Sequence, residues 1–230
     1  MIRTETARPT IVSDTRIHTF LAQIYLVMAF GLLITGLVST WTSSNLNLLL
    51  RLNTSPWIAF GLFIIQVFLV AVLSAAALRL APAVAGLLFI LYSGLTGLTI
   101  SSIFLVYTQE TISTVFWLSA GTFFATSLFG LLFKRDLSTS GSILFMLLLG
   151  WMFAWMFSWL FPFSSFNWLL TYIGIALFVG LTAHDTQRLK QIGQQIDSHP
   201  ARAGLVIIGA LTLYLNFINL FLLILRASRR

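Results

Sequence analysis

The sequence predicts an all-α polytopic membrane protein with seven transmembrane helices, and its composition and its long apolar runs carry that prediction. Of the 230 residues, 58% are hydrophobic and only 8% are charged, and the mean hydropathy is +0.96. A soluble domain is normally about one quarter charged, so this chain is suited to a solvent other than water. Apolar runs recur from residue 20 onward, and each is about as long as a helix needs to be to cross a bilayer.

Seven runs qualify as membrane-crossing helices, and they follow one another closely. The first is too long for the apolar region of a secretory signal and lacks a small-residue cleavage site, so we expect an uncleaved helix. The runs cover residues 20–38, 57–80, 84–107, 112–133, 143–161, 168–186 and 205–225.

The connections leave no room for a soluble domain. Residues 45–56 join the first two runs, and the longest polar connection between runs covers 187–202. We therefore predict a polar cytoplasmic tail over residues 1–17, one seven-helix membrane domain over 18–226, and a short basic C-terminal tail over 227–230.

Lysine and arginine near the ends of the runs indicate the orientation, because cytoplasmic loops carry an excess of them. With the N-terminus in the cytoplasm, nine basic residues fall inside and four outside. The inside set is Arg3, Arg8, Arg16, Arg79, Lys134, Arg135, Arg188, Lys190 and Arg202, and the outside set is Arg51, Arg226, Arg229 and Arg230.

Tryptophans support this orientation, whereas the C-terminal tail does not. The three C-terminal arginines fall on the wrong side, and a re-entrant last segment would change the count to twelve against one. The run 205–225 is long enough to span, so we prefer seven crossings. Five tryptophans then fall near the outer interface, as in an aromatic belt: Trp41, Trp57, Trp117, Trp159 and Trp168.

Several functional classes are disfavoured. The net charge of +7 comes from residues between apolar segments, where they act as topology signals and lipid-headgroup contacts, so the bilayer rather than nucleic acid is the expected partner. The chain has no cysteine, which removes disulfides, thiolate metal sites and a cysteine nucleophile. Its three histidines assemble no zinc cluster, and no nucleophile elbow or phosphate loop is present. We therefore expect no enzymatic activity and no cofactor.

Ionisable groups at membrane depth are the strongest functional candidates, because lipid makes them costly. Of six acidic residues, only Asp185 lies at the end of an apolar run. Asp185 is either an ion or proton ligand facing the bundle interior or the interfacial partner of Arg188 one turn on. Arg79 ends the second run on the same predicted side. It is either a counter-ion for Asp185 or an interfacial arginine with its charge in the headgroups.

The last run carries a polar stripe. Gly209, Thr212, Asn216 and Asn219 follow at intervals of three, four and three residues, which places them on one helix face. Such a stripe indicates a helix that faces partners or water. Interhelical hydrogen bonding explains it as well as ion conduction does.

Four segments resemble the Bax inhibitor family, in the right order and across nearly the whole chain. The strongest is GALTLYLNFINLFL at 209–222 in the last run. The others are LTGLTISSIF at 95–104, KRDL at 134–137 and FVGLTAHDTQ at 178–187. The similarity extends from about residue 20 to 226 and is greatest to bacterial members.

The resemblance implies a seven-helix fold whose last helix is central and surrounded by the other six, in the bacterial inner membrane. It also implies a pH-modulated Ca²⁺ leak through a pore lined by two aspartates, with an arginine that pairs with them when the pore is shut. Asp185 matches the first aspartate and Arg79 the arginine, but Asn216 stands where the family has its second aspartate. Relatives also suggest an alternative, a non-conducting membrane regulator that binds a partner such as a membrane-bound AAA protease.

The substitution at Asn216 changes the expected chemistry. Two close carboxylates repel and titrate together, whereas an Asp–Asn pair has one titrating proton and offers Ca²⁺ less charge. We therefore expect weaker or acid-shifted pH gating, weaker Ca²⁺ binding at Asp185 and Asn216, or neither activity. Histidine is the usual pH-sensing side chain near neutral pH, so His184 is a candidate substitute for the missing aspartate. It is a weak one, because helix neighbours point about 100° apart. Thr212 and Asn219 are the supporting polar positions.

Overall fold

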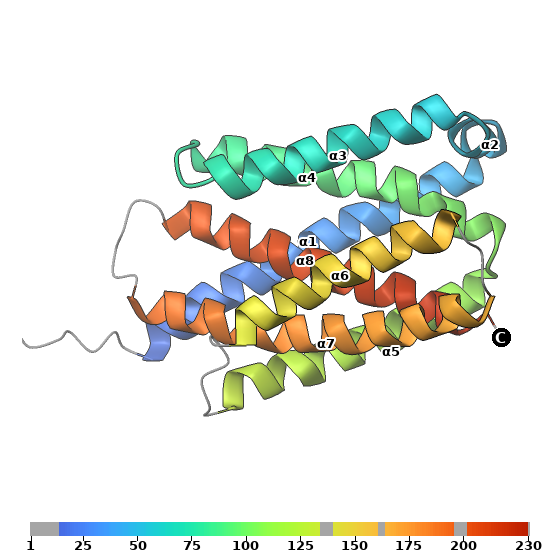
Figure 1. Ribbon diagram of the computed structural model, residues 1–230. Helices are drawn as coiled ribbons and strands as arrows, with labels where there is room; N and C mark the ends of the chain where they lie inside the picture. The colour runs from blue at the N-terminus through green and yellow to red at the C-terminus, as the bar shows by residue number, and fades with distance from the viewer. Residues whose placement is uncertain (1–13, 134–139, 161–163, 196–201, 230) are drawn as a thin grey trace, which may run out of the picture.

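The computed structural model describes residues 14–133, 140–160, 164–195 and 202–229. These residues are almost entirely helical, and Figure 1 shows the long helices running side by side as a bundle. The elements are α1 (Asp14–Ser44), α2 (Leu46–Thr54), α3 (Pro56–Ala76), α4 (Pro82–Ile100), the 3₁₀ helix η1 (Ser101–Leu105), α5 (Gln109–Leu132), α6 (Ser140–Leu160), α7 (Ser164–Gln195) and α8 (Arg202–Ala227).

The prediction of seven transmembrane helices is confirmed. Seven helices among the described residues are long and apolar enough to cross a membrane: α1, α3, α4 with η1, α5, α6, α7 and α8. Because the number of crossings is odd, α1 begins at one end of the bundle and α8 finishes at the other (Figure 1). We call the end where α1 begins the N-side and the end where α8 finishes the C-side. The last segment is one continuous helix of 26 residues, so the re-entrant alternative is wrong.

Helix α7 is longer than its apolar run. The sequence prediction ended this helix at residue 186, but α7 continues to Gln195. Hydropathy locates the part of a helix that suits lipid, whereas Gln, Arg and Lys are also good helix formers. Two of these polar residues have a structural role, because Gln187 Nε2 and Lys190 Nζ donate hydrogen bonds to the carbonyl oxygens of Phe133 and Leu131. They satisfy the end of α5, where carbonyl groups lack intrahelical partners.

Helix α2 lies within the predicted connection 45–56. The side chain of Asn45 caps its first turn by accepting a hydrogen bond from the backbone N–H of Leu48. Leu49 is buried against the bundle, whereas Leu46 is 61% exposed. Figure 1 shows α2 end-on at the C-side, so it lies across the direction of the long helices. This placement is typical of an amphipathic helix at a membrane interface.

The seven helices differ greatly in burial, and α8 is the most buried. In the apolar 18-residue stretch of α8, 67% of the residues are buried, whereas the corresponding values are 11% in α3 and 6% in α6. Helix α8 packs mainly against α1, α4, α5 and α7, while α3 packs mainly on α4 and α6 mainly on α7. The prediction that the six other helices surround α8 is therefore not confirmed.

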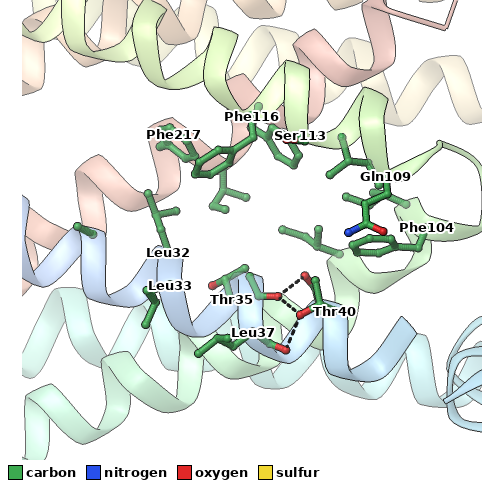
Figure 2. Close-up of a pocket in the computed structure, with 18 residues that line it drawn as sticks. Leu32, Leu33, Thr35, Leu37, Thr40, Phe104, Gln109, Ser113, Phe116 and Phe217 are labelled. Atoms are coloured by element: carbon green, nitrogen blue, oxygen red, sulfur yellow. Dashed lines mark hydrogen bonds between the residues drawn. The ribbon is translucent and has the colours of Figure 1, made fainter. Parts of the chain in front are cut away.

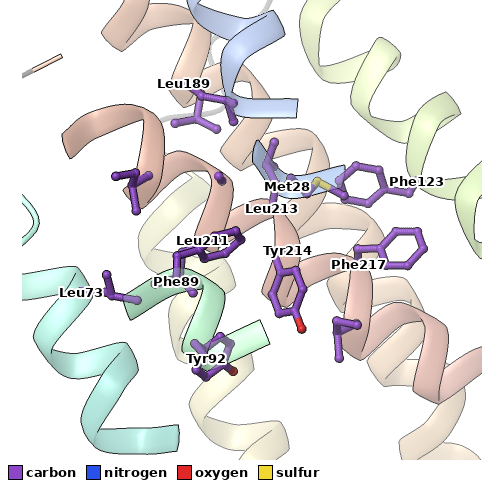
Figure 3. Close-up of a cluster of buried hydrophobic side chains, with 14 of the residues drawn as sticks. Met28, Leu73, Phe89, Tyr92, Phe123, Leu189, Leu211, Leu213, Tyr214 and Phe217 are labelled. Atoms are coloured by element: carbon purple, nitrogen blue, oxygen red, sulfur yellow. The ribbon is translucent and has the colours of Figure 1, made fainter. Parts of the chain in front are cut away.

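The core is built around α8. In Figure 3 Tyr214 lies between helices, with its ring edge-on to those of Phe89 and Tyr92 from α4. The same cluster draws side chains from α1, α3, α5 and α7: Met28, Leu73, Phe123 and Leu189.

Three parts of the sequence analysis concern residues outside the described ranges. These are the N-terminal tail as far as residue 13, the KRDL segment at 134–137 with Lys134 and Arg135, and the last residue, Arg230. Among the described belt tryptophans, Trp41, Trp57, Trp117 and Trp168 are exposed.

Candidate functional site

A hydrogen bond joins the two polar residues that the sequence marked as a pair. Asn216 Nδ2 on α8 donates to Asp185 Oδ2 on α7 at 2.7 Å. Asp185 was placed at a helix end, but the structure places it ten residues before Gln195, the last residue of α7. At 1.5 Å per residue that is about 15 Å inside the helix. The Asp185 side chain is 15% exposed and Asn216 is buried, so the pair lies within the bundle, well before the end of α7.

His184 is the second partner of the carboxylate. Its Nδ1 lies 3.0 Å from Asp185 Oδ1, so these helix neighbours meet despite their different directions. The imidazole is buried and packs against Gly141 at the start of α6, where an added Cβ would lie 2.7 Å from His184 Nε2. The absence of a side chain at Gly141 therefore makes room for the ring.

An open groove of about 790 Å³ leads to this pair from the N-side. It lies between α6 and α7 and begins where α6 starts and α7 ends. The α7 wall includes the charged or titratable residues of the groove, which are His184, Asp185 and Arg188. The rest of its lining is Gly141, Ser142, Phe145, Met146, Leu181, Gln191, Ile192 and Gln195. The carboxylate of Asp185 is therefore part of the wall of this groove.

Neither predicted arginine partner is bonded to Asp185. Arg79 is exposed in the turn after α3, a turn that packs near Gly204 at the start of α8. Gly204 is twelve residues from Asn216, about 18 Å along the helix. Among the described residues, no hydrogen bond or ion pair joins Asp185 to Arg79 or to Arg188. The structure thus brings Asp185, His184 and Asn216 together and leaves Arg79 apart.

The residues of the polar stripe on α8 do not form one hydrogen-bonded group. Thr212 Oγ1 donates to the Ile208 carbonyl oxygen at 3.0 Å, and Asn219 Nδ2 donates to that of Leu215 at 2.8 Å. Both groups are bonded within their own helix. Asn216 is the member of the stripe that reaches across to α7.

Two buried hydroxyl clusters were not predicted. Tyr25 on α1 bonds to Ser127 on α5, and Ser127 Oγ lies 2.8 Å from Thr186 Oγ1 on α7, next to Asp185. Thr35 Oγ1 on α1 lies 2.6 Å from the hydroxyl of Tyr214 on α8. A lone hydroxyl in an apolar helix is a weak sequence signal, because such a group usually bonds its own backbone. These contacts become apparent only when helices far apart in sequence are packed together.

The approach of α5 to α7 fixes the position of the site. A Cβ at Gly130 would overlap the carbonyl oxygen of Ala183, two residues before Asp185. Small residues permit such close packing of helices in membranes. No group of three or more His, Cys, Asp or Glu side chains that could hold a metal occurs among the residues described.

Comparison with known proteins covers nearly the whole chain. The family model described as "Inhibitor of apoptosis-promoting Bax1" matches residues 17–228. The inner membrane protein YbhL of Escherichia coli is 46% identical over 212 residues, which is 91% of each chain. Proteins of Deinococcus radiodurans and Borreliella burgdorferi are 39% and 36% identical over 210 residues, 91% of this chain and 90% of theirs. This chain therefore belongs to the Bax inhibitor family.

Proposed function

We propose that this protein is a pH-modulated Ca²⁺ leak pathway in which Asp185 and Asn216 form the ion-selective point. The observation that carries the proposal is the 2.7 Å hydrogen bond between them, together with the groove on the N-side that Asp185 lines. A carboxylate held at membrane depth and reached by a groove is typical of an ion or proton pathway.

In this proposal, the contact between Asn216 and Asp185 corresponds to a site that is closed to cations. The amide nitrogen of Asn216 faces the carboxylate, and so takes the place that a cation would occupy. Ca²⁺ binds carboxylate and amide carbonyl oxygens. A passing ion would therefore displace the amide N–H, and Asn216 would rotate to present its oxygen. Such a pair offers two ligands and one charge, which suits a weak and transient contact with a permeant ion.

The charge of Asp185 is the proposed source of the pH dependence, because a neutral carboxyl attracts a cation much less than a carboxylate does. The leak is therefore expected to fall as pH is lowered. The other titratable or charged groups that line the groove are His184 and Arg188 on α7. The described lining from α6 carries no charge, and Asn216 on α8 is neutral.

The test is Ca²⁺ flux into proteoliposomes under mildly acidic and mildly basic conditions. We expect wild-type flux to be greater in base and to be lost in Asp185→Asn, which keeps the shape of the side chain and removes its charge. Asn216→Asp restores a second carboxylate and should increase both flux and pH dependence, because two acids bind Ca²⁺ more strongly and titrate together.

Two outcomes would contradict the proposal. Wild-type flux equal to that of empty liposomes would show that this protein does not conduct Ca²⁺. Equal flux in wild type and Asp185→Asn would show that ions pass elsewhere. Arg79→Ala is the control, because Arg79 is exposed in the turn after α3. That turn packs near Gly204, which is about 18 Å along α8 from Asn216. Its flux should remain that of the wild type.

A non-conducting regulator is the second candidate, and Asn216 favours it. A protein that binds a membrane partner, such as a membrane-bound protease, does not need the second acidic ligand that Asn216 replaces. This role predicts no wild-type flux and co-purification of one stoichiometric membrane protein from mild detergent. Flux that appears only in Asn216→Asp would support the regulator and show that the fold has kept the pathway in latent form.

We further propose that the N-side faces the cytoplasm of a bacterial inner membrane. The order of the apolar runs along the sequence assigns nine basic residues to that side and four to the other, which supports this orientation. Reporter fusions at the C-terminus would test it: a reporter active only outside the cytoplasm should be active there.

A further inference from the structure

A second cavity lies on the C-side, away from the groove. It has a volume of about 590 Å³ and is enclosed by α1, η1, α5 and α8. Figure 2 shows side chains of α1 facing those of α5 and α8 across the space. Its walls include Leu32, Gly36, Ile103, Phe116, Phe217 and Phe221. Its size lies in the range of about 300–1,000 Å³ found for sites that bind small molecules.

The cavity offers little to water. Most of its lining is apolar, and three of its four hydroxyl groups, those of Thr35, Ser39 and Thr40, are hydrogen-bonded. Thr35 Oγ1 lies 2.6 Å from the hydroxyl of Tyr214, and Thr40 Oγ1 donates to the Gly36 carbonyl oxygen at 2.9 Å. A buried water needs two to four polar partners. An apolar molecule is therefore a better occupant than water or an ion.

The cavity has the depth of one leaflet. Along α1 it extends from Ala29 to Thr40, eleven residues or about 16 Å. The hydrocarbon core of a bilayer is about 30 Å thick, so the cavity spans about half of it. At its C-side end it reaches Thr40, the residue before the belt residue Trp41, and the first turn of α5, where Gln109 lines it.

The mouth of the cavity faces lipid. Leu33 and Leu37 line it from α1 and are 58% and 61% exposed. In a chain that spans a membrane these exposed apolar side chains contact hydrocarbon. The cavity is therefore continuous with the lipid-facing surface of the bundle.

We propose that this cavity binds one acyl chain of a phospholipid from the C-side leaflet, with the headgroup near Gln109. Leaving the cavity empty would deprive its lining of dispersion contacts, and the neighbouring bilayer supplies chains of the right chemistry and length. The bound chain would reach Phe217, whose ring packs edge-on against those of Phe116 and Phe123. Because Phe217 follows Asn216, the lipid would contact α8 beside the candidate ion site. The lipid site does not depend on whether the protein conducts ions.

The experiment uses a phosphatidylethanolamine probe with a photoreactive diazirine near the end of one acyl chain, in proteoliposomes of the full chain. Phe217 and Phe221 are only 3% and 5% exposed, so ordinary boundary lipid does not reach them. Exposed Trp117 and Phe124, at 71% and 69%, report boundary lipid in the same sample. We expect adducts on both pairs in the wild type.

A matched pair of variants makes the test specific. An added Cβ at Gly36 or at Gly121 meets nothing within 4 Å, and only Gly36 lines the cavity. Gly36→Leu should fill the cavity and remove the adducts on Phe217 and Phe221, whereas Gly121→Leu should leave them unchanged. Ser113→Leu, which fills the cavity from α5, serves if Gly36→Leu does not fold.

The proposal is overturned if Phe217 and Phe221 carry no adducts in the wild type while Trp117 is labelled. It is also overturned if the adducts persist at wild-type level in folded Gly36→Leu or Ser113→Leu. Loss of adducts at the two buried residues, with unchanged labelling of Trp117, supports it.

Discussion

Two cavities in the described part of the chain lie on opposite sides of the bundle and differ in their chemistry. The N-side groove between α6 and α7 has both apolar and polar walls, and its polar groups include His184, Asp185 and Arg188. The C-side cavity is lined mainly by carbon and extends along α1 from Ala29 to Thr40. We propose that this difference separates two tasks: the groove would bring ions or protons to a carboxylate, whereas the apolar cavity is continuous with lipid.

A buried layer of α8 separates the two cavities. Tyr214, Asn216 and Phe217 are all at most 6% exposed, and each is bonded or packed to a different neighbour. Asn216 bonds to α7, Tyr214 bonds to α1, and Phe217 packs on α5. An ion that reached Asp185 from the groove would have to pass this layer. One helix thus carries both the candidate ion ligand and the barrier behind it.

The largest expected difference between the cavities is their access to water. The chain has no cysteine, so an introduced cysteine is the only thiol that a reagent can modify. Leu181 lines the groove and Leu32 lines the C-side cavity, and both are half-buried. A charged methanethiosulfonate reagent should modify Leu181→Cys on the order of a hundredfold faster than Leu32→Cys. Moving a charge out of water costs several kcal/mol, and each 1.4 kcal/mol is a factor of ten.

The control for this comparison is a small, membrane-permeant maleimide, which should reach both positions. Equal rates with the charged reagent would mean that the C-side cavity holds water. That result would make it an outer vestibule of the ion pathway and contradict the lipid proposal. Slow reaction at Leu181→Cys would mean that the groove is not open to solvent.

The second expected effect is on stability, and it concerns the helix that forms one wall of the groove. Gly130→Ala places a methyl group against the Ala183 carbonyl oxygen, a backbone atom that cannot turn aside. We expect a loss of about 3 kcal/mol in the free energy of unfolding, the upper part of the usual range for overpacking. Unfolding by SDS in mixed micelles would measure it.

The control is Gly121→Ala on the same helix, where the added Cβ meets nothing within 4 Å. Its stability should be unchanged or slightly higher, because alanine favours helix. Equal stability of Gly130→Ala and Gly121→Ala would show that α5 and α7 do not approach as closely as the structure has them.

The helices could be predicted from the sequence more completely than their packing. Seven crossings follow from seven apolar runs, because lipid obliges each run to form its own backbone hydrogen bonds. The extension of α7 to Gln195 could not be predicted in this way, since its last residues are polar and are held by α5. The sequence also could not predict which helices are buried. Helices α6 and α8 are both strongly apolar, and only their packing shows whether a side chain contacts lipid or protein.

The candidate site shows the same division. Asp185 and Asn216 stood out because polar groups are rare in apolar runs, and the structure joins them. The contact between His184 and Gly141 could not be predicted, since it depends on how α6 lies on α7. The same holds for Arg79. The sequence places it at the end of the second run, but only the packing shows that its turn lies near Gly204, about 18 Å along α8 from Asn216.

The smallest expected effect concerns two hydroxyl groups that line the C-side cavity. Thr35 and Thr40 both line this cavity from α1. Thr35 also bonds to Tyr214 on α8, while the hydroxyl of Thr40 bonds to the carbonyl oxygens of Gly36 and Leu37 on its own helix. Thr35→Val keeps the shape and removes the hydroxyl, so the buried hydroxyl of Tyr214 loses this partner. We expect a loss of about 0.6–1.7 kcal/mol in the free energy of unfolding, the range for hydrogen bonds between transmembrane helices.

Thr40→Val should change the free energy of unfolding by less than Thr35→Val does, because the hydroxyl of Thr40 makes no bond to another helix in the described part of the chain. If the two variants are equally stable, the hydroxyl pair contributes nothing to the barrier between the cavities. If Thr35→Val alone is destabilised and also gains Ca²⁺ flux, the contact between α1 and α8 is part of the barrier. The apolar side of the molecule would then control passage through the polar side, although the two cavities share no ionisable group.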